Sequence, residues 1–307
     1  MKAVALALCL LASTHALVER IIGGARVPDG TYPFAVRLTI TTASDNLLCG
    51  GALVDRGLVV TAAHCMVDTT NNAVFAPSEV SVCYGASSIT KQSCTTARNV
   101  TVHPDYDPLT LSNDIAAIQI SPLTLSANVA TVPVYAGKLP AGTNLTTMGW
   151  GKTESDSSSS LPASLMSVGI EIGDANTCQQ AQPSYKSADG PEVCSVNALT
   201  PGKDSCQGDS GSPTVVDDNG VVYLAALTSS GVDLADPGAV DCATKDGLAF
   251  YTHVYHFIDF VAAAANRSAS DLTSPDDRNS DDDLTSAAPP APAAALLLAA
   301  LLALLIQ

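Results

Sequence analysis

The sequence predicts an all-β protein that has two sets of strands and one closing helix. Its apolar runs are short, rich in Val, Ile and Thr, and separated by Gly, Asn, Asp and Pro. This pattern is typical of strands joined by turns. The runs fall into two sets of about six, divided by a segment at residues 121–134 that has two prolines and little periodicity.

The first set of expected strands covers residues 34–40, 51–54, 58–62, 80–84, 98–103 and 114–120. The second covers residues 144–150, 165–172, 192–196, 213–217, 221–229 and 248–252. Apolar residues then recur at helical spacing at Val254, Phe257, Ile258 and Val261. They predict an amphipathic helix over residues 254–265.

The N-terminus has the features of a secretory signal. Lys2 is followed by an apolar run over residues 3–12 and then by Thr14, His15 and Ala16. We expect a signal peptide over 1–16. The run is too short to cross a bilayer as a stable helix. Residues 17–20 would then form a short propeptide.

The C-terminus changes composition after residue 265. Ser, Asp, Thr and Pro dominate residues 266–292, which we expect to be a disordered linker, because such a segment cannot bury a core. An apolar tail at 293–307 reaches the chain end. A polar spacer before such a tail is typical of a glycolipid (GPI) attachment signal, which would anchor the protein to a membrane. The alternatives are a retained short membrane helix and an unprocessed tail.

Charge and cysteine content narrow the classes of function. The net charge is −16, which argues against a nucleic-acid partner, since that needs a basic face. Nine cysteines are present, of which Cys9 lies in the leader. The remaining eight indicate an oxidising compartment and up to four disulfides. Zinc is the competing interpretation, but no Cys-x-x-Cys pair occurs, so we expect no metal site. Sequons at Asn99, Asn144 and Asn266 predict a glycoprotein, with Asn266 the leading candidate.

Three stretches contain candidate catalytic residues. The loop 202–213 holds Ser210 between glycines, and its tight backbone would let the amides of Gly208 and Ser210 point at one spot. A plain surface turn is the alternative for this loop alone. His64 follows the apolar run 58–63, and Asp114 enters the run 115–120.

These motifs together resemble the trypsin/chymotrypsin family of serine proteases over residues 21–265. Among the arrangements of such a triad, only that family has the chain order His64, Asp114, Ser210. The resemblance implies two six-stranded antiparallel β-barrels with a C-terminal helix. It also implies a secreted or surface-attached, monomeric endopeptidase that acts on proteins or peptides, meets protein inhibitors and needs no cofactor. The rival function is a catalytically silent surface binding protein on the same fold.

The family pattern implies a role for each site residue. Ser210, His64 and Asp114 would form the triad, and the amides of Gly208 and Ser210 the oxyanion hole. The primary specificity pocket would consist of Asp204, Ser205, Ser229, Gly231 and Ala249. Asp204 favours cleavage after Arg or Lys. Ser230 in place of the usual tryptophan and Ala249 in place of glycine predict reduced efficiency.

Activation and cross-linking follow from the same resemblance. Cleavage between Arg20 and Ile21 would release an ammonium group that inserts beside Asp209. Three disulfides are implied, which leaves one pair, Cys83 with Cys94, as a local staple that is not in the common family pattern. The implied pairs are Cys49 with Cys65, Cys178 with Cys194, and Cys206 with Cys242. The family's calcium loop falls between Cys83 and Cys94 but lacks its carboxylates here, so we expect no calcium.

Overall fold

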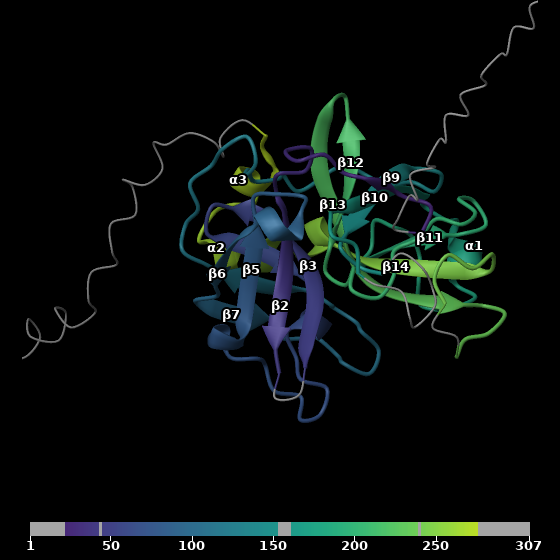
Figure 1. Ribbon diagram of the computed structural model, residues 1–307. Coiled ribbons are helices and arrows are strands. Elements are labelled where there is room, and N and C mark those ends of the chain that lie inside the picture. The colour runs from purple at the N-terminus through teal and green to yellow at the C-terminus, as the bar shows by residue number, and fades with distance from the viewer. Residues whose placement is uncertain (1–21, 43–44, 153–160, 239–240, 276–307) are drawn as a thin grey trace, which may run out of the picture.

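The computed structural model describes residues 22–42, 45–152, 161–238 and 241–275. The expected signal peptide, propeptide, anchor tail and most of the linker lie outside these ranges. Two seven-stranded antiparallel sheets make up most of the described part of the chain (Figure 1). The all-β prediction is therefore confirmed, with one more strand in each unit than expected.

The first sheet has the order β6-β5-β2-β3-β4-β8-β7. Its inner strand β2 alternates buried and partly buried residues, and Val36, Leu38 and Ile40 are fully buried in the core. Its strands are β2 (Ala35–Thr41), β3 (Asn46–Asp55), β4 (Leu58–Thr61), β5 (Val80–Tyr84), β6 (Ser93–Thr96), β7 (Asn99–Val102) and β8 (Ala116–Gln119).

The second sheet has the order β1-β10-β9-β12-β13-β14-β11. Its strands are β1 (Ala25–Arg26), β9 (Asn144–Gly149), β10 (Met166–Glu171), β11 (Glu192–Val196), β12 (Pro213–Asp218), β13 (Val221–Asp233) and β14 (Gly247–His253). The expected strand 221–229 is thus four residues too short. The strand continues because β14 stays paired with it as far as Asp233, opposite Gly247.

Helical segments are few and short. The expected helix 254–265 forms as a 3-10 turn, η4 (Val254–Phe257), followed by α2 (Ile258–Ala265). The other helices are η1 (Ala63–Cys65), η2 (Pro77–Glu79), η3 (Ile89–Lys91), α1 (Ala175–Cys178) and α3 (Ala269–Thr273). Within the described residues, no helix has the length and apolar character needed to cross a membrane.

The expectation of disorder from residue 266 onward is wrong for its first part. Ser268 accepts a hydrogen bond from the amide of Asp271 and caps α3. Leu272 is buried in the core, and its carbonyl accepts a hydrogen bond of 2.9 Å from the amide of Val134. A capped turn with one apolar anchor therefore forms in spite of the polar composition around it.

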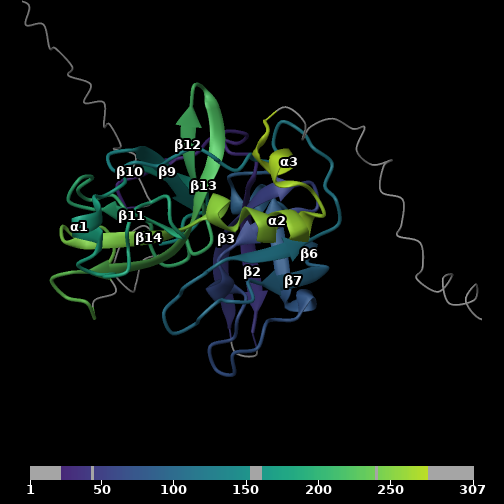
Figure 2. The ribbon, with the colours of Figure 1, turned by 180° about the vertical axis from the view of Figure 1, so that it is seen from behind.

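The molecule has two halves, each built around one of the sheets, and elements near both ends of the described chain connect them. Strand β1 precedes the first sheet in sequence but pairs with β10 of the second. Helix α2 follows the second sheet but packs against β4 and β8 of the first, and Figure 2 shows it over that half. A third connection comes from Trp150, whose indole Nε1 donates to the carbonyl of Ser87 at 2.8 Å. These crossings hold the two sheets in a fixed relation.

Four disulfides are present, with the pairing that the sequence analysis expects. Cys83 and Cys94 face each other in register on β5 and β6. Strand β6 was not expected, because Ser93, Thr95 and Thr96 give it no apolar pattern. Its pairing with β5 and this disulfide hold it at the edge of the sheet.

Candidate active site

The site lies where the two halves meet, and each half contributes part of it. His64 sits on η1 directly after β4, and Asp114 lies just before β8, both in the first half. Ser210 precedes β12 in the second half. The Ser210 carbonyl accepts a hydrogen bond of 2.8 Å from the amide of Gly50 on β3. The loop that carries Ser210 is therefore hydrogen-bonded directly to the first sheet.

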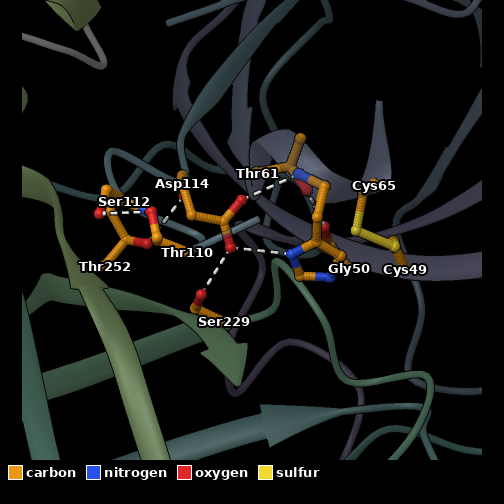
Figure 3. A network of polar contacts seen from close by, with 10 residues as sticks. Cys49, Gly50, Thr61, Cys65, Thr110, Ser112, Asp114, Ser229 and Thr252 are labelled. Carbon is orange, nitrogen blue, oxygen red and sulfur yellow. Dashed lines mark hydrogen bonds and ion pairs between the residues drawn. A yellow bond between two sulfur atoms is a disulfide. The ribbon is translucent and has the colours of Figure 1, made fainter. Parts of the chain in front are cut away.

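Asp114 is buried and holds His64 through two hydrogen bonds. Figure 3 shows the Asp114 carboxylate at the centre of the network, with Ser229 beside it. The backbone amide of His64 donates to Oδ1 of Asp114 at 2.8 Å, and Nδ1 of His64 lies 2.8 Å from Oδ2. This geometry places the proton of the neutral imidazole on Nδ1 and leaves Nε2 as the basic nitrogen. The Cys49–Cys65 disulfide restrains the turn that carries His64.

Ser229 completes the environment of Asp114. Its hydroxyl donates to Oδ2 of Asp114 at 2.5 Å. The pairing of β13 with β14 shifts by one residue between Thr228 and Ser230, so Ser229 is the extra residue of a bulge. A bulge re-aims a side chain, and here the hydroxyl is aimed across the interface at Asp114.

Two opposing effects act on the Asp114 carboxyl. Burial by itself raises its pKa, but the hydrogen bonds and charge of His64, together with the hydroxyl of Ser229, outweigh burial and lower the pKa below its usual value. Asp114 is therefore an anion at neutral pH. A buried anion beside the imidazole stabilises the imidazolium that forms when His64 takes up a proton.

The backbone around Ser210 is arranged by glycine. Gly208 has φ +95°, a conformation that residues with a Cβ rarely adopt. Among the described residues, no acceptor contacts the amide of Gly208 or of Ser210. Both predicted oxyanion donors are thus available to a ligand.

Asp209 is buried directly before Ser210 in the chain. Its carboxylate accepts hydrogen bonds from the amides of Gly151 at 2.7 Å and Cys206 at 2.9 Å. Burial raises the pKa of Asp209 to about 7, although these two amides oppose the shift. The predicted partner Ile21 lies outside the described residues. A carboxyl so strongly desolvated would be stabilised as an anion by a nearby cation.

Sequence reasoning missed the residues that make room for Asp209. A Cβ on Gly149 would lie 2.1 Å from Oδ1 of Asp209, and a Cβ on Gly151 would lie 2.5 Å from its Cγ. Both positions therefore require glycine. The signal that could have indicated them is the Gly-Trp-Gly sequence at the end of β9.

A cavity of about 260 Å³ lies beside Ser210. It is lined by all five residues that were predicted to form the specificity pocket: Asp204, Ser205, Ser229, Gly231 and Ala249. Asp204 is only 6% exposed, and burial raises its pKa. The described lining includes two more carboxylates, Asp233 and Asp241, and no Lys, Arg or His. This cavity is suited to a cationic side chain.

A second hollow, of about 490 Å³, also borders Ser210 and has otherwise different lining residues. It shares Ser210 with the first cavity and is also lined by His64. Its other walls are mainly the apolar side chains of Leu48, Val67 and Phe75 and the Cys49–Cys65 disulfide. A peptide bond placed at Ser210 would therefore have two hollows beside it.

Comparison with known proteins agrees with the resemblance to serine proteases that the sequence motifs indicate. The family model described as Trypsin matches residues 21–261. Serine protease 1 of Rattus norvegicus is 32% identical over 248 residues, which cover 79% of this chain and 89% of that protein. Trypsin Tyr p 3.0101 of Tyrophagus putrescentiae is 28% identical, covering 83% of each chain.

A longer relative matches over part of its length only. Mannan-binding lectin serine protease 1 of Homo sapiens is 29% identical over 260 residues, covering 80% of this chain. The match spans only 35% of that protein.

Proposed function

Because the chain belongs to the trypsin family and is a serine-type endopeptidase, we propose that it cleaves peptide bonds with Ser210, His64 and Asp114 as its triad. Ser210 attacks the scissile carbonyl while Nε2 of His64 takes up its proton. The observation that carries this proposal is the buried Asp114 carboxylate, which accepts hydrogen bonds from both His64 and Ser229.

The amides of Gly208 and Ser210 receive the oxyanion that forms in the attack. A single donor of this kind is worth about 3 kcal/mol in a comparable enzyme. His64 then returns the proton to the leaving amine. That amine and the residues after it lie in the apolar hollow lined by His64, Leu48 and Phe75.

The specificity proposed is cleavage after Arg or Lys. Asp204 lies buried in the cavity beside Ser210 without a basic residue among the described lining. A substrate ammonium or guanidinium would supply the missing charge, whereas an apolar side chain would leave the carboxylate unpaired. The methyl group of Ala249 narrows the same cavity and reduces efficiency.

Labelling with a fluorophosphonate probe tests the proposed activity. We expect the activated protein to be labelled at Ser210, because the probe reacts only with an activated serine next to an oxyanion site. Ser210→Ala should abolish labelling and peptide hydrolysis. Absence of labelling in a chain whose N-terminus is Ile21 would support the silent binding protein instead.

We also propose that the protein is made as an inactive precursor, secreted or held at the cell surface, and activated by cleavage after Arg20. Two features support this. Asp209 is buried, and its hydrogen-bond donors among the described residues are backbone amides. The segment after the cut also lies against the pocket, since the amide of Asp204 donates to the carbonyl of Ile22 at 3.4 Å. The new ammonium of Ile21 would pair with Asp209.

Replacing Arg20 by Gln should keep the protein inactive, because a protease that cuts after basic residues no longer recognises the site. Activity on an Arg peptide and the N-terminal sequence are measured on the same sample. Lys138→Gln removes an exposed basic residue outside the site and should activate as the wild type does. Full activity in a chain that still begins at Leu17 would refute the proposal.

A further inference from the structure

The base of the specificity cavity contains a contact that the family resemblance did not suggest. Oδ2 of Asp204 accepts a hydrogen bond of 2.9 Å from Nδ2 of Asn197 and a longer one of 3.3 Å from the amide of Ala243. The other oxygen, Oδ1, has the hydroxyl of Ser205 at 3.5 Å. The shorter and stronger contacts are thus made to a single oxygen.

Asn197 is held rigidly for this contact. It directly follows β11 and is only 2% exposed. Its amide donates to the carbonyl of Gly247 at 3.0 Å, and its carbonyl accepts from the amide of Thr200 at 3.1 Å. Because both backbone groups are fixed, the side chain has little freedom to turn away from Asp204.

Gly247, the first residue of β14, provides the space that Asn197 needs. A Cβ on Gly247 would lie 2.4 Å from Nδ2 of Asn197 and 2.8 Å from Oγ1 of Thr244. Any side chain at this position would therefore displace the amide from Asp204. The interaction depends on two residues, one that donates and one that leaves room.

We propose that Asn197, with Gly247, is a positioning residue that determines specificity. It fixes Oδ2 of Asp204 so that Oδ1 is presented to the basic side chain of the substrate. This inference rests on the proposed role of Asp204 in binding Arg or Lys.

The charges around Asp204 explain why a fixed donor is needed. Burial raises the pKa of Asp204, and the Asn197 side chain is the first of the groups that oppose this rise. The other titratable groups nearby do not favour the anion. Asp209 and Tyr251 interact with Asp204 electrostatically, and Asp233 and Asp241 line the same cavity. Before a substrate arrives, the groups that favour the anion of Asp204 are therefore neutral hydrogen-bond donors, with Asn197 first among them.

The test uses the activated full-length chain with Asn197→Ala, Gly247→Ala, the double variant, and Gly169→Ala as a control. Gly169 lies within β10, and a Cβ there would meet only the carbonyl of Leu145 at 3.9 Å. For each protein, kcat/KM on a peptide with Arg before the cut is measured from pH 5 to 9. The rate of fluorophosphonate labelling is measured in parallel, because it does not depend on Asp204.

Asn197→Ala should lower kcat/KM by about 10- to 100-fold, the range for a hydrogen bond to a charged group. The acidic limb of the pH profile should also move to higher pH. The sign follows because loss of the donor raises the pKa of Asp204, so the anion is lost earlier as the pH falls. Labelling at pH 8 should be unchanged, and Gly169→Ala should resemble the wild type.

Gly247→Ala should reproduce the effect of Asn197→Ala, and the double variant should be no worse than Asn197→Ala alone, since both changes remove one interaction. Additive losses, or a pH limb that does not move, would overturn the inference. If Asn197→Ala fails to fold, the isosteric Asn197→Asp is used. It should move the limb further, because a second carboxylate faces Asp204. Wild-type protein that is labelled but does not cleave after Arg or Lys would instead refute the proposed specificity.

Discussion

Asp114→Asn should lower kcat by about 10⁴-fold at pH 8 with little change in KM, as the same change does in a comparable triad. Oδ1 of Asp114 accepts a hydrogen bond from the backbone amide of His64, and Oδ2 accepts from both Nδ1 of His64 and the hydroxyl of Ser229. In the asparagine variant the side-chain oxygen stays opposite the backbone amide, because that N–H can only donate, and the NH₂ group then faces Nδ1 of His64. This favours the tautomer of His64 with the proton on Nε2, and Nε2 could no longer take up the proton of Ser210 as proposed.

The measurement is steady-state hydrolysis of an Arg peptide by the activated protein. Asp107→Asn is a matched control, because Asp107 is a partly exposed carboxylate in the preceding loop that accepts hydrogen bonds from the amide of Leu109 and the hydroxyl of Thr110. Its kcat should stay within about twofold of the wild type, because these exposed contacts are worth a few tenths of a kcal/mol. A loss smaller than tenfold in Asp114→Asn would show that Asp114 does not set the tautomer of His64.

The lowered pKa of Asp114 determines how this residue changes the stability of the fold with pH. A carboxylate whose pKa is depressed by folding contributes stability at pH values above its ordinary pKa, and that contribution is lost as the pH falls through the lowered value. Asp114 therefore does not titrate between pH 5 and 8. An acidic limb in that range belongs to another group.

Asp204→Ser should lower kcat/KM for Arg and Lys peptides by about 10⁴-fold, which is the discrimination available to a site that pairs buried polar groups. The serine cannot neutralise the substrate cation. Fluorophosphonate labelling of Ser210 should remain, because the probe brings no basic side chain. Kinetics on a peptide library that varies the residue before the cut measure both the loss and any new preference.

Asp233→Ser is the matched control for this variant. Asp233 lines the same cavity, but its carboxylate accepts hydrogen bonds from the amides of Ala235 at 2.7 Å and Asp236 at 3.2 Å within its own loop. We expect its preference for basic residues to be retained. Wild-type preference for Phe, Leu or Ala would show that Asp204 does not contact the substrate side chain.

The bounds of a strand could be predicted from the sequence where turn-forming residues stand on both sides of a short apolar run. β5 and β11 have the expected bounds, because buried and turn-forming residues delimit them clearly. The short edge strand β6 is polar and is held by its neighbour and a disulfide, so nothing in its own composition predicts it. Helix α3 was missed for a related reason, because the average composition of the linker hides one capped turn with Leu272 as its anchor.

In the candidate site, too, the sequence predicts only those residues that lie in a recognisable local pattern. His64, Asp114 and Ser210 could be identified because each lies in a motif whose order along the chain is informative. Gly149, Gly151 and Asn197 could not, because their importance lies in what they approach in space. The contact of Asn197 with Asp204 joins residues from the end of β11 and the loop before β12, and no local pattern encodes it.

The bond between Trp150 and Ser87 gives the molecule an internal optical reporter. Trp150 is the only tryptophan of the chain, and its buried indole bridges the two halves. The same halves supply His64 and Asp114 on one side and Ser210 and Ser229 on the other. Separation of the halves would expose the indole to water and shift its emission to longer wavelength. Emission and turnover would then follow the same docking event, so assembly of the site can be timed in a refolding chain without an added label.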